Sequence, residues 1–445
     1  MLRRDFLMMT TAGGALAAIG APAFAKNGAG SAKAATAITK VFGDGVRLKA
    51  VVVEYDRPLK GSALSPATFT VEDRTVTGVF TSTTGKSADR ADRGRFVIIL
   101  LSSEDANAAL AEKLQPQGDG NAQPKGPGGP GKAGDIPTYD TVYRKAEATI
   151  VQAGPVSTAD GDVIPASAKP LATTRVENLI VDNFRQLEFR DPATGALLRY
   201  NLFVPKNYDA SKSYPLVLFM HDAGATSDVT RTTLFQGLGA VAWARSQDQG
   251  ERPCFVLAPQ YAEIIADDDS KTSDMLDTTI DLVKALADEY SIDSNRLYAT
   301  GQSGGCMMSI AMNIKYPDFF AASFLVAGQW DPALVTPLAK KKLWILVSQD
   351  DDKAYPGENA MTEVLEKQGA KIARAVWDGT WTKDEFRAAF DKIDAEGSPI
   401  NYVTFRKGTV IPTGESSAGA SGHRNTWRIA YTIEPIREWI FRQHG

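Results

Sequence analysis

The pattern of apolar and polar positions divides the chain into two parts. Between about residues 38 and 155, apolar residues occur in short runs with strand character, separated by turn residues and without a clear helical period. These runs are VRLKAVVVEYD, ATFTVED, TVTGVFTS, RFVIILLS and YRKAEATIVQ. Short strands of this kind predict a β-sandwich, which we place at residues 37–155.

From about residue 176 onward, apolar strand-like runs alternate with amphipathic helices. The expected strands are RYNLFVP, YPLVLFMHD, CFVLAP, RLYATG, AASFLVAG and LWILVS. One intervening helix presents Leu276, Ile280, Val283, Ala287 and Tyr290 on a single face. This alternation predicts a mostly parallel sheet covered by helices on both faces, over residues 176–445. In such sheets the reactive groups gather beyond the carboxyl ends of the strands.

Three segments fall outside these two domains or interrupt them. Residues 1–25, MLRRDFLMMTTAGGALAAIGAPAFA, have paired arginines, an apolar run and a small-residue end, which predicts an export signal. The Arg3-Arg4 pair resembles a twin-arginine signal, and an ordinary secretory signal is the alternative. Either one predicts a periplasmic or secreted protein. Residues 26–36 are expected to form a tether, and the Gly/Pro-rich stretch at about 115–136 a disordered loop.

Composition excludes several classes of function. The 445 residues are 43% hydrophobic and 23% charged, with a formal net charge of -4, so there is no basic field to hold nucleic acid or anionic lipid. We expect no stable membrane span after removal of the signal. Cys254 and Cys306 are expected to be buried free thiols. The sequence contains no metal cluster, Rossmann glycine fingerprint or P-loop, so no cofactor is implied.

The stretch ATGQSGGCMMS holds the candidate nucleophile, Ser303. It has the pattern Gly-x-Ser-x-Gly between an expected strand and an expected helix, which is the context of a nucleophile in a tight strand-to-helix turn. Small neighbours let such a turn approach the adjoining elements without clashes. The backbone N–H of Gly304, at the start of the helix, could stabilise an oxyanion.

A serine nucleophile needs a base to take its proton, and a third group to orient that base. The chain has three histidines, His221, His423 and His444. His423 lies in a glycine-rich loop before the last helix, which favours it as the base. The acid is expected in the aspartates 350–352, which follow the strand LWILVS. The chain order of serine, aspartate and histidine is the one typical of α/β-hydrolases.

Several ordered motifs resemble bacterial α/β-hydrolase esterases related to polyhydroxybutyrate depolymerases and feruloyl esterases, with an immunoglobulin-like domain in front. The motifs are YPLVLFMHDAG, FVLAPQ, IDSNRLYATGQSGGCMMSIAMNIKYPDFFAA and GHRNTWRIAYTIEPIREWIF. The resemblance implies Ser303 as nucleophile and His423 as base. It places the acid on Asp352, four residues before Pro356, with Asp351 as the alternative because the loop departs from the family pattern.

The resemblance also implies an oxyanion loop at residues 221–224. The family tends to read His-Gly-x-Gly, whereas this chain has Asp222 at the second position. A carboxylate there would lie near an anion site unless it turned outward. The implied oxyanion donors are the backbone N–H groups of Gly304 and Ala223. Trp330, beyond the next strand end, is a candidate for the wall of the substrate pocket, with plain core packing as the alternative.

These observations predict a secreted serine carboxylester hydrolase that forms an acyl-enzyme on a small or polymeric ester. A serine peptidase of the prolyl-oligopeptidase kind is an alternative with the same fold and triad, although the front region is too short for a propeller. A catalytically inert adhesion or scaffold protein is a third hypothesis. The front sandwich contains no plausible chemistry, and we expect it to affect stability, access of large substrates or assembly into a homo-oligomer.

Overall fold

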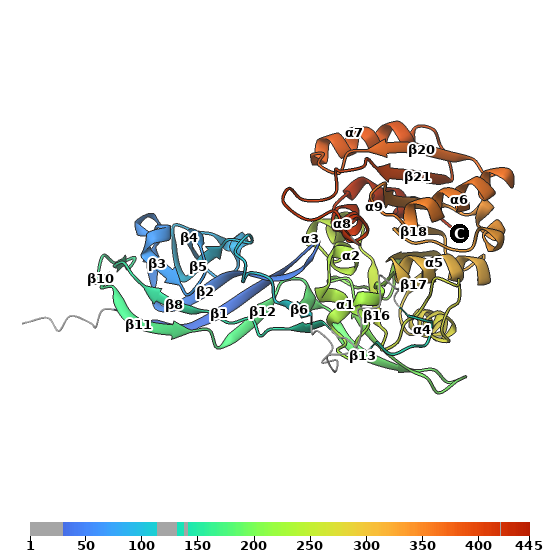
Figure 1. Ribbon diagram of the computed structural model, residues 1–445. Helices are drawn as coiled ribbons and strands as arrows, with labels where there is room; N and C mark the ends of the chain where they lie inside the picture. The colour runs from blue at the N-terminus through green and yellow to red at the C-terminus, as the bar shows by residue number, and fades with distance from the viewer. Residues whose placement is uncertain (1–29, 114–130, 138–140, 419) are drawn as a thin grey trace, which may run out of the picture.

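The computed structural model describes residues 30–113, 131–137, 141–418 and 420–445. The predicted export signal at residues 1–25 lies outside the described residues. Among the helices that are described, none is both long and apolar enough to cross a membrane. The chain forms a β-rich front domain and a larger α/β domain beside it, coloured blue to green and green to red in Figure 1.

The front domain is built on a five-stranded sheet with the order β12-β1-β2-β5-β4. A three-stranded sheet, β11-β8-β3, and the small pairs β9–β10 and β6–β7 complete it. Its long central strand β2 alternates, so that Val51, Val53 and Tyr55 are buried on one face. The strands are β1 Ala32–Phe42, β2 Gly45–Lys60, β3 Phe69–Val71, β4 Val76–Ser82, β5 Arg93–Leu101, β6 Ala111–Lys113, β7 Thr141–Tyr143, β8 Thr149–Gln152, β9 Val156–Ser157, β10 Val163–Ile164, β11 Ser167–Ala172 and β12 Arg175–Asn178.

The front domain extends beyond both predicted ends. Residues 32–36 begin β1, so the prediction of a tether over residues 26–36 is wrong there. At the other end, β11 pairs with β8, and β12 pairs with β1, so the front sheets continue to Asn178 instead of ending at residue 155. Most side chains of β11 and β12 are exposed, and these strands therefore lack the apolar alternation that marks a strand in a sequence.

The second domain contains a nine-stranded sheet with the order β13-β14-β16-β15-β17-β18-β19-β21-β20. The pairs β13–β14 and β14–β16 are antiparallel and the other pairs are parallel. The strands are β13 Arg185–Arg190, β14 Leu197–Phe203, β15 Tyr214–Met220, β16 Phe255–Gln260, β17 Ile292–Gln302, β18 Ala322–Val326, β19 Leu343–Ser348, β20 Ile372–Trp377 and β21 Ile400–Phe405. All side chains of β15, β16, β18, β19 and β21 are buried, as expected of strands covered on both faces.

Helices cover this sheet, and the predicted fold class, an α/β-hydrolase fold behind an all-β domain, is confirmed. The helices are α1 Thr232–Phe235, α2 Leu238–Val241, α3 Ser246–Glu251, α4 Met275–Glu289, α5 Gly304–Lys315, α6 Ala354–Lys367, α7 Lys383–Asp394, α8 Ser421–Ala430 and α9 Glu434–Phe441. Helix α4 has the predicted apolar face, with Leu276, Ile280 and Val283 buried.

One segment of the front domain is held by the second domain. The backbone of residues 131–135 pairs with the loop after β16: the Gly134 N–H donates to the Ile264 carbonyl at 2.8 Å, and the Ile264 N–H donates to the Asp135 carbonyl at 2.8 Å. The Ala133 N–H donates to Asp267 Oδ2 at 3.0 Å. The prediction of a disordered loop at about 115–136 is therefore wrong for residues 131–135. Their backbone groups form hydrogen bonds with residues more than a hundred positions away.

Candidate active site

Ser303 lies in the turn between β17 and α5, with φ 53° and ψ -120°. A non-glycine residue in the left-handed region carries strain that its surroundings must hold in place. The Ser303 N–H donates to the Val326 carbonyl of β18 at 3.0 Å, which ties the turn to the neighbouring strand.

The flanking glycines are required by close packing. A Cβ on Gly301 would lie 2.4 Å from the Gly305 carbonyl oxygen, and a Cβ on Gly305 would lie 2.0 Å from the Met220 carbonyl oxygen of β15. No side chain fits at either position without displacing backbone. The prediction that small residues let this turn approach its neighbours is thus confirmed.

His423 meets Ser303 from the first turn of α8, so the expectation that it lies in a loop before the last helix is wrong. Its Nε2 atom lies 2.8 Å from the Ser303 Oγ atom, although the two residues are 120 positions apart in the chain. The imidazole packs edge to face on Trp427 of the same helix, with ring centroids 4.8 Å apart. The helix start is pressed against the loop after β19, since a Cβ on Gly422 would lie 2.3 Å from the Asp350 carbonyl oxygen. That loop supplies the third member of the group.

The carboxyl group that orients His423 belongs to Asp351. Its Oδ2 atom lies 2.5 Å from His423 Nδ1, while Oδ1 accepts hydrogen bonds from the N–H groups of Lys353 at 3.1 Å and Ala354 at 2.8 Å. Burial alone would raise the pKa of Asp351, but the His423 hydrogen bond and these two amides together lower it. Asp351 is therefore held as an anion behind the imidazole.

The prediction of Asp352 as the acid is wrong, and the alternative left open, Asp351, is the residue in contact. Asp352 is exposed. The spacing to Pro356 misplaced the acid by one residue because Pro356 lies inside the first turn of α6. Asp351 is fixed instead by its hydrogen bond from the N–H of Ala354, the first residue of that helix.

The two predicted oxyanion donors lie side by side. A Cβ on Gly304 would be 3.6 Å from the Ala223 nitrogen. Gly304 is the first residue of α5, and Ala223 is the first residue of the short helical turn Ala223–Ala225. The first N–H groups of a helix or helical turn have no partner within it, and the Gly304 N–H also lies at the positive dipole end of α5, so both positions suit an anion.

His221 helps to fix the orientation of the Ala223 N–H, together with the Ala225 N–H, which also donates to the Asp222 carbonyl, at 3.1 Å. Its Nε2 atom accepts from the Tyr261 N–H at 3.0 Å, so the proton is on Nδ1, which donates to the Asp222 carbonyl oxygen at 2.8 Å. Burial lowers the pKa of His221 and keeps the ring neutral, against the opposing effect of that carbonyl. Because a trans peptide directs its C=O and N–H in opposite directions, holding the Asp222 carbonyl aims the Ala223 N–H the other way.

The sequence left open whether the Asp222 carboxylate lies near the anion site or turns outward. In the structure both of its oxygens accept hydrogen bonds from other groups. Its Oδ1 atom accepts from the Gly224 N–H at 2.8 Å and its Oδ2 atom from the Gln302 Nε2 amide at 2.9 Å. Trp330 is 6% exposed and lies in the hydrophobic core, so the structure places it among packed side chains. Its role as a pocket wall stays a prediction.

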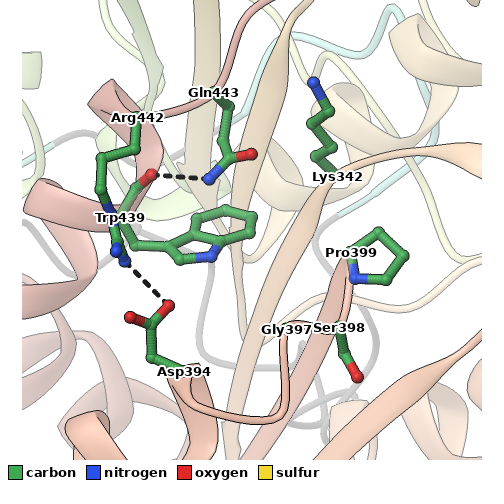
Figure 2. A pocket seen from close by; sticks show the side chains of 8 residues that line it. All are labelled: Lys342, Asp394, Gly397, Ser398, Pro399, Trp439, Arg442 and Gln443. Carbon is green, nitrogen blue, oxygen red and sulfur yellow. Dashed lines mark hydrogen bonds and ion pairs between the residues drawn. The ribbon is translucent and has the colours of Figure 1, made fainter.

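A surface pocket lies elsewhere on the second domain. It has a volume of about 440 Å³ and is lined by Lys342, Asp394, Gly397, Ser398, Pro399, Trp439, Arg442 and Gln443. Figure 2 shows Arg442 paired with Asp394 at its edge. Lys342 precedes β19, whereas Asp351 follows that strand, so the pocket is at the opposite end of the sheet from Ser303. Among the described residues, no group of three His, Cys, Asp or Glu side chains could hold a metal ion.

The fold and this arrangement of side chains define an α/β-hydrolase. Residues 34–165 match the family of esterase Ig-like N-terminal domains, and residues 261–374 match the prolyl oligopeptidase family. A solved thermostable esterase is similar over 93% of this chain and 100% of its own, with 26% identity and a TM-score of 0.73.

Other solved structures are more distant. A feruloyl esterase module from Clostridium thermocellum is similar over 57% of this chain and 87% of its own, with 13% identity and a TM-score of 0.38. A search of curated proteins finds no match. The protein is a serine hydrolase with an esterase Ig-like N-terminal domain, which confirms the predicted family resemblance and enzyme class.

Proposed function

We propose that this protein is an exported carboxylester hydrolase that works through an acyl-enzyme on Ser303. The observation that carries the proposal is the continuous hydrogen-bonded chain from Ser303 Oγ through the His423 ring to Asp351. This arrangement lets the imidazole take the serine proton while a buried anion stabilises the resulting cation.

The reaction follows from these contacts. Ser303 Oγ attacks the ester carbonyl carbon as its proton passes to His423 Nε2. The tetrahedral oxyanion accepts hydrogen bonds from the Gly304 and Ala223 N–H groups. His423 then returns the proton to the leaving alcohol, and the acyl group remains on Ser303. A water molecule, deprotonated by His423, attacks the acyl-enzyme and releases the acid.

The direct test is hydrolysis of p-nitrophenyl acetate and butyrate by the protein and by Ser303→Ala. We expect the variant to keep its melting temperature and lose several orders of magnitude in rate, as removal of a triad nucleophile typically does. A folded variant that retained a tenth of the wild-type turnover would exclude Ser303 as the nucleophile.

A serine peptidase is the second candidate, because residues 261–374 match the prolyl oligopeptidase family. The Ig-like front domain of an esterase argues against it, since it replaces the expected propeller. Dipeptide anilides tested beside the esters separate the two activities. An inert scaffold is the third candidate, and lack of labelling of the folded protein by a fluorophosphonate probe would favour it.

Export and assembly form a separate part of the proposal. The paired arginines at positions 3 and 4 support export of the folded protein to the periplasm or beyond. Replacing both with lysine should retain the protein in the cytoplasm if the signal is of the twin-arginine type. Size-exclusion chromatography of the full chain, compared with a chain that begins near residue 179, tests whether the front domain mediates a homo-oligomer.

A further inference from the structure

A second carboxyl group is buried behind the nucleophile and has no part in the proposed reaction. Glu358 lies on α6 and is 1% exposed. Its Oε1 atom accepts a hydrogen bond from the Gly328 N–H at 3.2 Å. Its Oε2 atom is buried and has no hydrogen-bond partner among the described residues. An unpaired polar atom in the interior is costly, so its retention here calls for a reason.

The partner of Glu358 lies directly under the nucleophile turn. A Cβ on Gly328 would be 3.1 Å from the Ser303 carbonyl oxygen and 2.6 Å from Cys306 Sγ, in the first turn of α5. Two residues earlier, the Val326 carbonyl accepts the Ser303 N–H. The backbone of residues 326–328 is therefore the floor on which the nucleophile turn rests.

This floor is itself strained. Ala327 has φ 50°, in the left-handed region that non-glycine residues seldom adopt. Such a conformation persists only where surrounding contacts hold it. The Ala327 N–H donates to the Leu346 carbonyl at 3.0 Å, and the next N–H, of Gly328, is the one that Glu358 accepts. Glu358 thus holds one side of a strained segment that contacts Ser303.

The surroundings favour the uncharged form of Glu358. Burial raises the pKa of this carboxyl well above its usual range, the Gly328 hydrogen bond opposes that change, and the nearby Asp351 anion adds to it. The titratable groups that face Glu358 are Asp351 from the loop after β19, Cys306 from α5 and Tyr402 from β21. None of these three is a cation that could balance a second buried anion.

We propose that Glu358 is a positioning residue for Ser303. As a neutral carboxylic acid, it accepts the Gly328 N–H and thereby holds the strained segment 326–328 on which the nucleophile turn rests. The neutral form keeps the acceptor for Gly328 without placing a second anion beside Asp351. Such an anion would stabilise the protonated form of the His423 imidazole and so alter the proton transfers between His423, Ser303 and the substrate. This proposal rests on the proposed function of Ser303.

The test compares Glu358→Gln, which keeps a neutral acceptor of similar shape, with Glu358→Met, which removes it. Thr362→Val is the matched control, because Thr362 is buried one turn further along α6 and bonds to the Glu358 carbonyl of its own helix. For each variant, kcat and KM on p-nitrophenyl butyrate are measured from about pH 5 to pH 9. Melting temperatures and the rate of fluorophosphonate labelling of Ser303 are measured in parallel.

We expect folded E358M to lose about 10- to 100-fold in kcat with little change in KM, because the nucleophile is misplaced and binding is not. E358Q should recover most of that rate and keep the acidic limb of the pH profile unmoved. Folded E358M with wild-type kcat, or E358Q with its acidic limb moved to lower pH, would overturn the proposal. The second result would show that an anion had been removed.

Two further outcomes are an E358M variant that does not fold and a wild-type protein that hydrolyses no ester. If E358M does not fold, E358Q alone decides: a near-wild-type rate with an unmoved acidic limb supports the proposal, and a tenfold loss overturns it. If the wild-type protein hydrolyses no ester, the proposed function fails. The positioning role is then judged by the labelling rate of Ser303, which needs only an activated serine.

Discussion

Gly43, at the tip of the β1–β2 hairpin of the Ig-like domain, lies directly against Arg428 of α8. A Cβ at position 43 would come within 2.5 Å of the Arg428 carbonyl oxygen and within 2.5 Å of its Cγ atom. On the other side of the hairpin, the Gly43 carbonyl oxygen would be 3.1 Å from a Cβ on Gly237, which precedes α2. The front domain therefore touches the helix that carries His423, five residues before Arg428.

This contact predicts that the front domain affects turnover as well as stability. Gly43→Ala should displace α8 or the hairpin, because the new methyl group meets backbone that cannot yield easily. Overpacking of this kind typically costs about 1–3 kcal/mol. The resulting shift of His423 should lower kcat by about tenfold or more, since a misplacement of about 1 Å in catalytic geometry costs up to about 10²-fold.

The measurement is kcat on p-nitrophenyl butyrate beside the melting temperature. Gly250→Ala is the matched control, because a Cβ at that position on α3 meets nothing within 4 Å. If G43A were folded and as active as G250A, the hairpin would not help to position α8, and the sandwich would contribute only outside the chemical step.

The two neighbouring aspartates give a second, paired prediction. Asp351→Asn replaces the carboxylate that holds His423 Nδ1, and should lower kcat by about 10⁴-fold, as loss of the triad acid does in serine proteases. Asp352→Asn changes an exposed neighbour and should leave kcat within about twofold of the wild type, in the range of an ordinary surface substitution. Steady-state hydrolysis of one soluble ester distinguishes them, and equal effects would contradict the assignment of Asp351.

These aspartates also show where sequence reasoning reached its limit. The strand-to-helix context and the chain order predicted that Ser303 and His423 meet, and their side-chain atoms are 2.8 Å apart. The acid was missed by one residue because its position depends on where α6 begins. A carboxylate that accepts the first N–H of a helix with one oxygen and binds a histidine with the other leaves no spacing signal of its own.

The fold was predictable to a similar depth. Buried strands such as Tyr214–Met220 are recognisable in the sequence as apolar runs, and these runs predicted the sheet of the second domain. The exposed strand Ser167–Ala172 and the ordered segment at residues 131–135 were missed, because their partners are backbone groups distant in sequence. Glu358 was missed as well, since a glutamate on an amphipathic helix normally faces solvent.

A third prediction concerns His221 and the oxyanion site. His221→Ala removes the side-chain donor to the Asp222 carbonyl and leaves only the Ala225 N–H, at 3.1 Å, so the Asp222–Ala223 peptide is held less firmly and the Ala223 N–H is less well aimed. We expect kcat to fall by about 10²-fold, approaching the loss of a whole oxyanion donor. KM should change little, because the oxyanion forms after binding. His444→Ala, at the exposed C-terminal end, is the control. Wild-type kcat in a folded H221A protein would contradict this role.

The last prediction concerns stability against pH and isolates the charge of Glu358 from catalysis. Its pKa is raised by folding, so above the ordinary glutamate pKa of about 4.3 the folded state binds more protons than the unfolded state. By linkage, the stability contributed by the protonated group is complete below that pH and is lost as the pH rises towards the folded-state pKa. The loss is about 1.4 kcal/mol for each pH unit within this window. The free energy of unfolding of E358Q, which does not titrate, should therefore rise relative to the wild type as the pH increases from the ordinary glutamate pKa towards the raised folded-state pKa.

Urea denaturation at several pH values measures this difference, with Glu366→Gln as the control, because Glu366 is on the same helix and pairs with Arg374 at the surface. The difference between E366Q and the wild type should stay nearly constant over the same range. If the difference between E358Q and the wild type were equally constant, Glu358 would titrate alike in the folded and unfolded states. A neutral acid beneath Ser303 would then be wrong, whatever the kinetics of the variants.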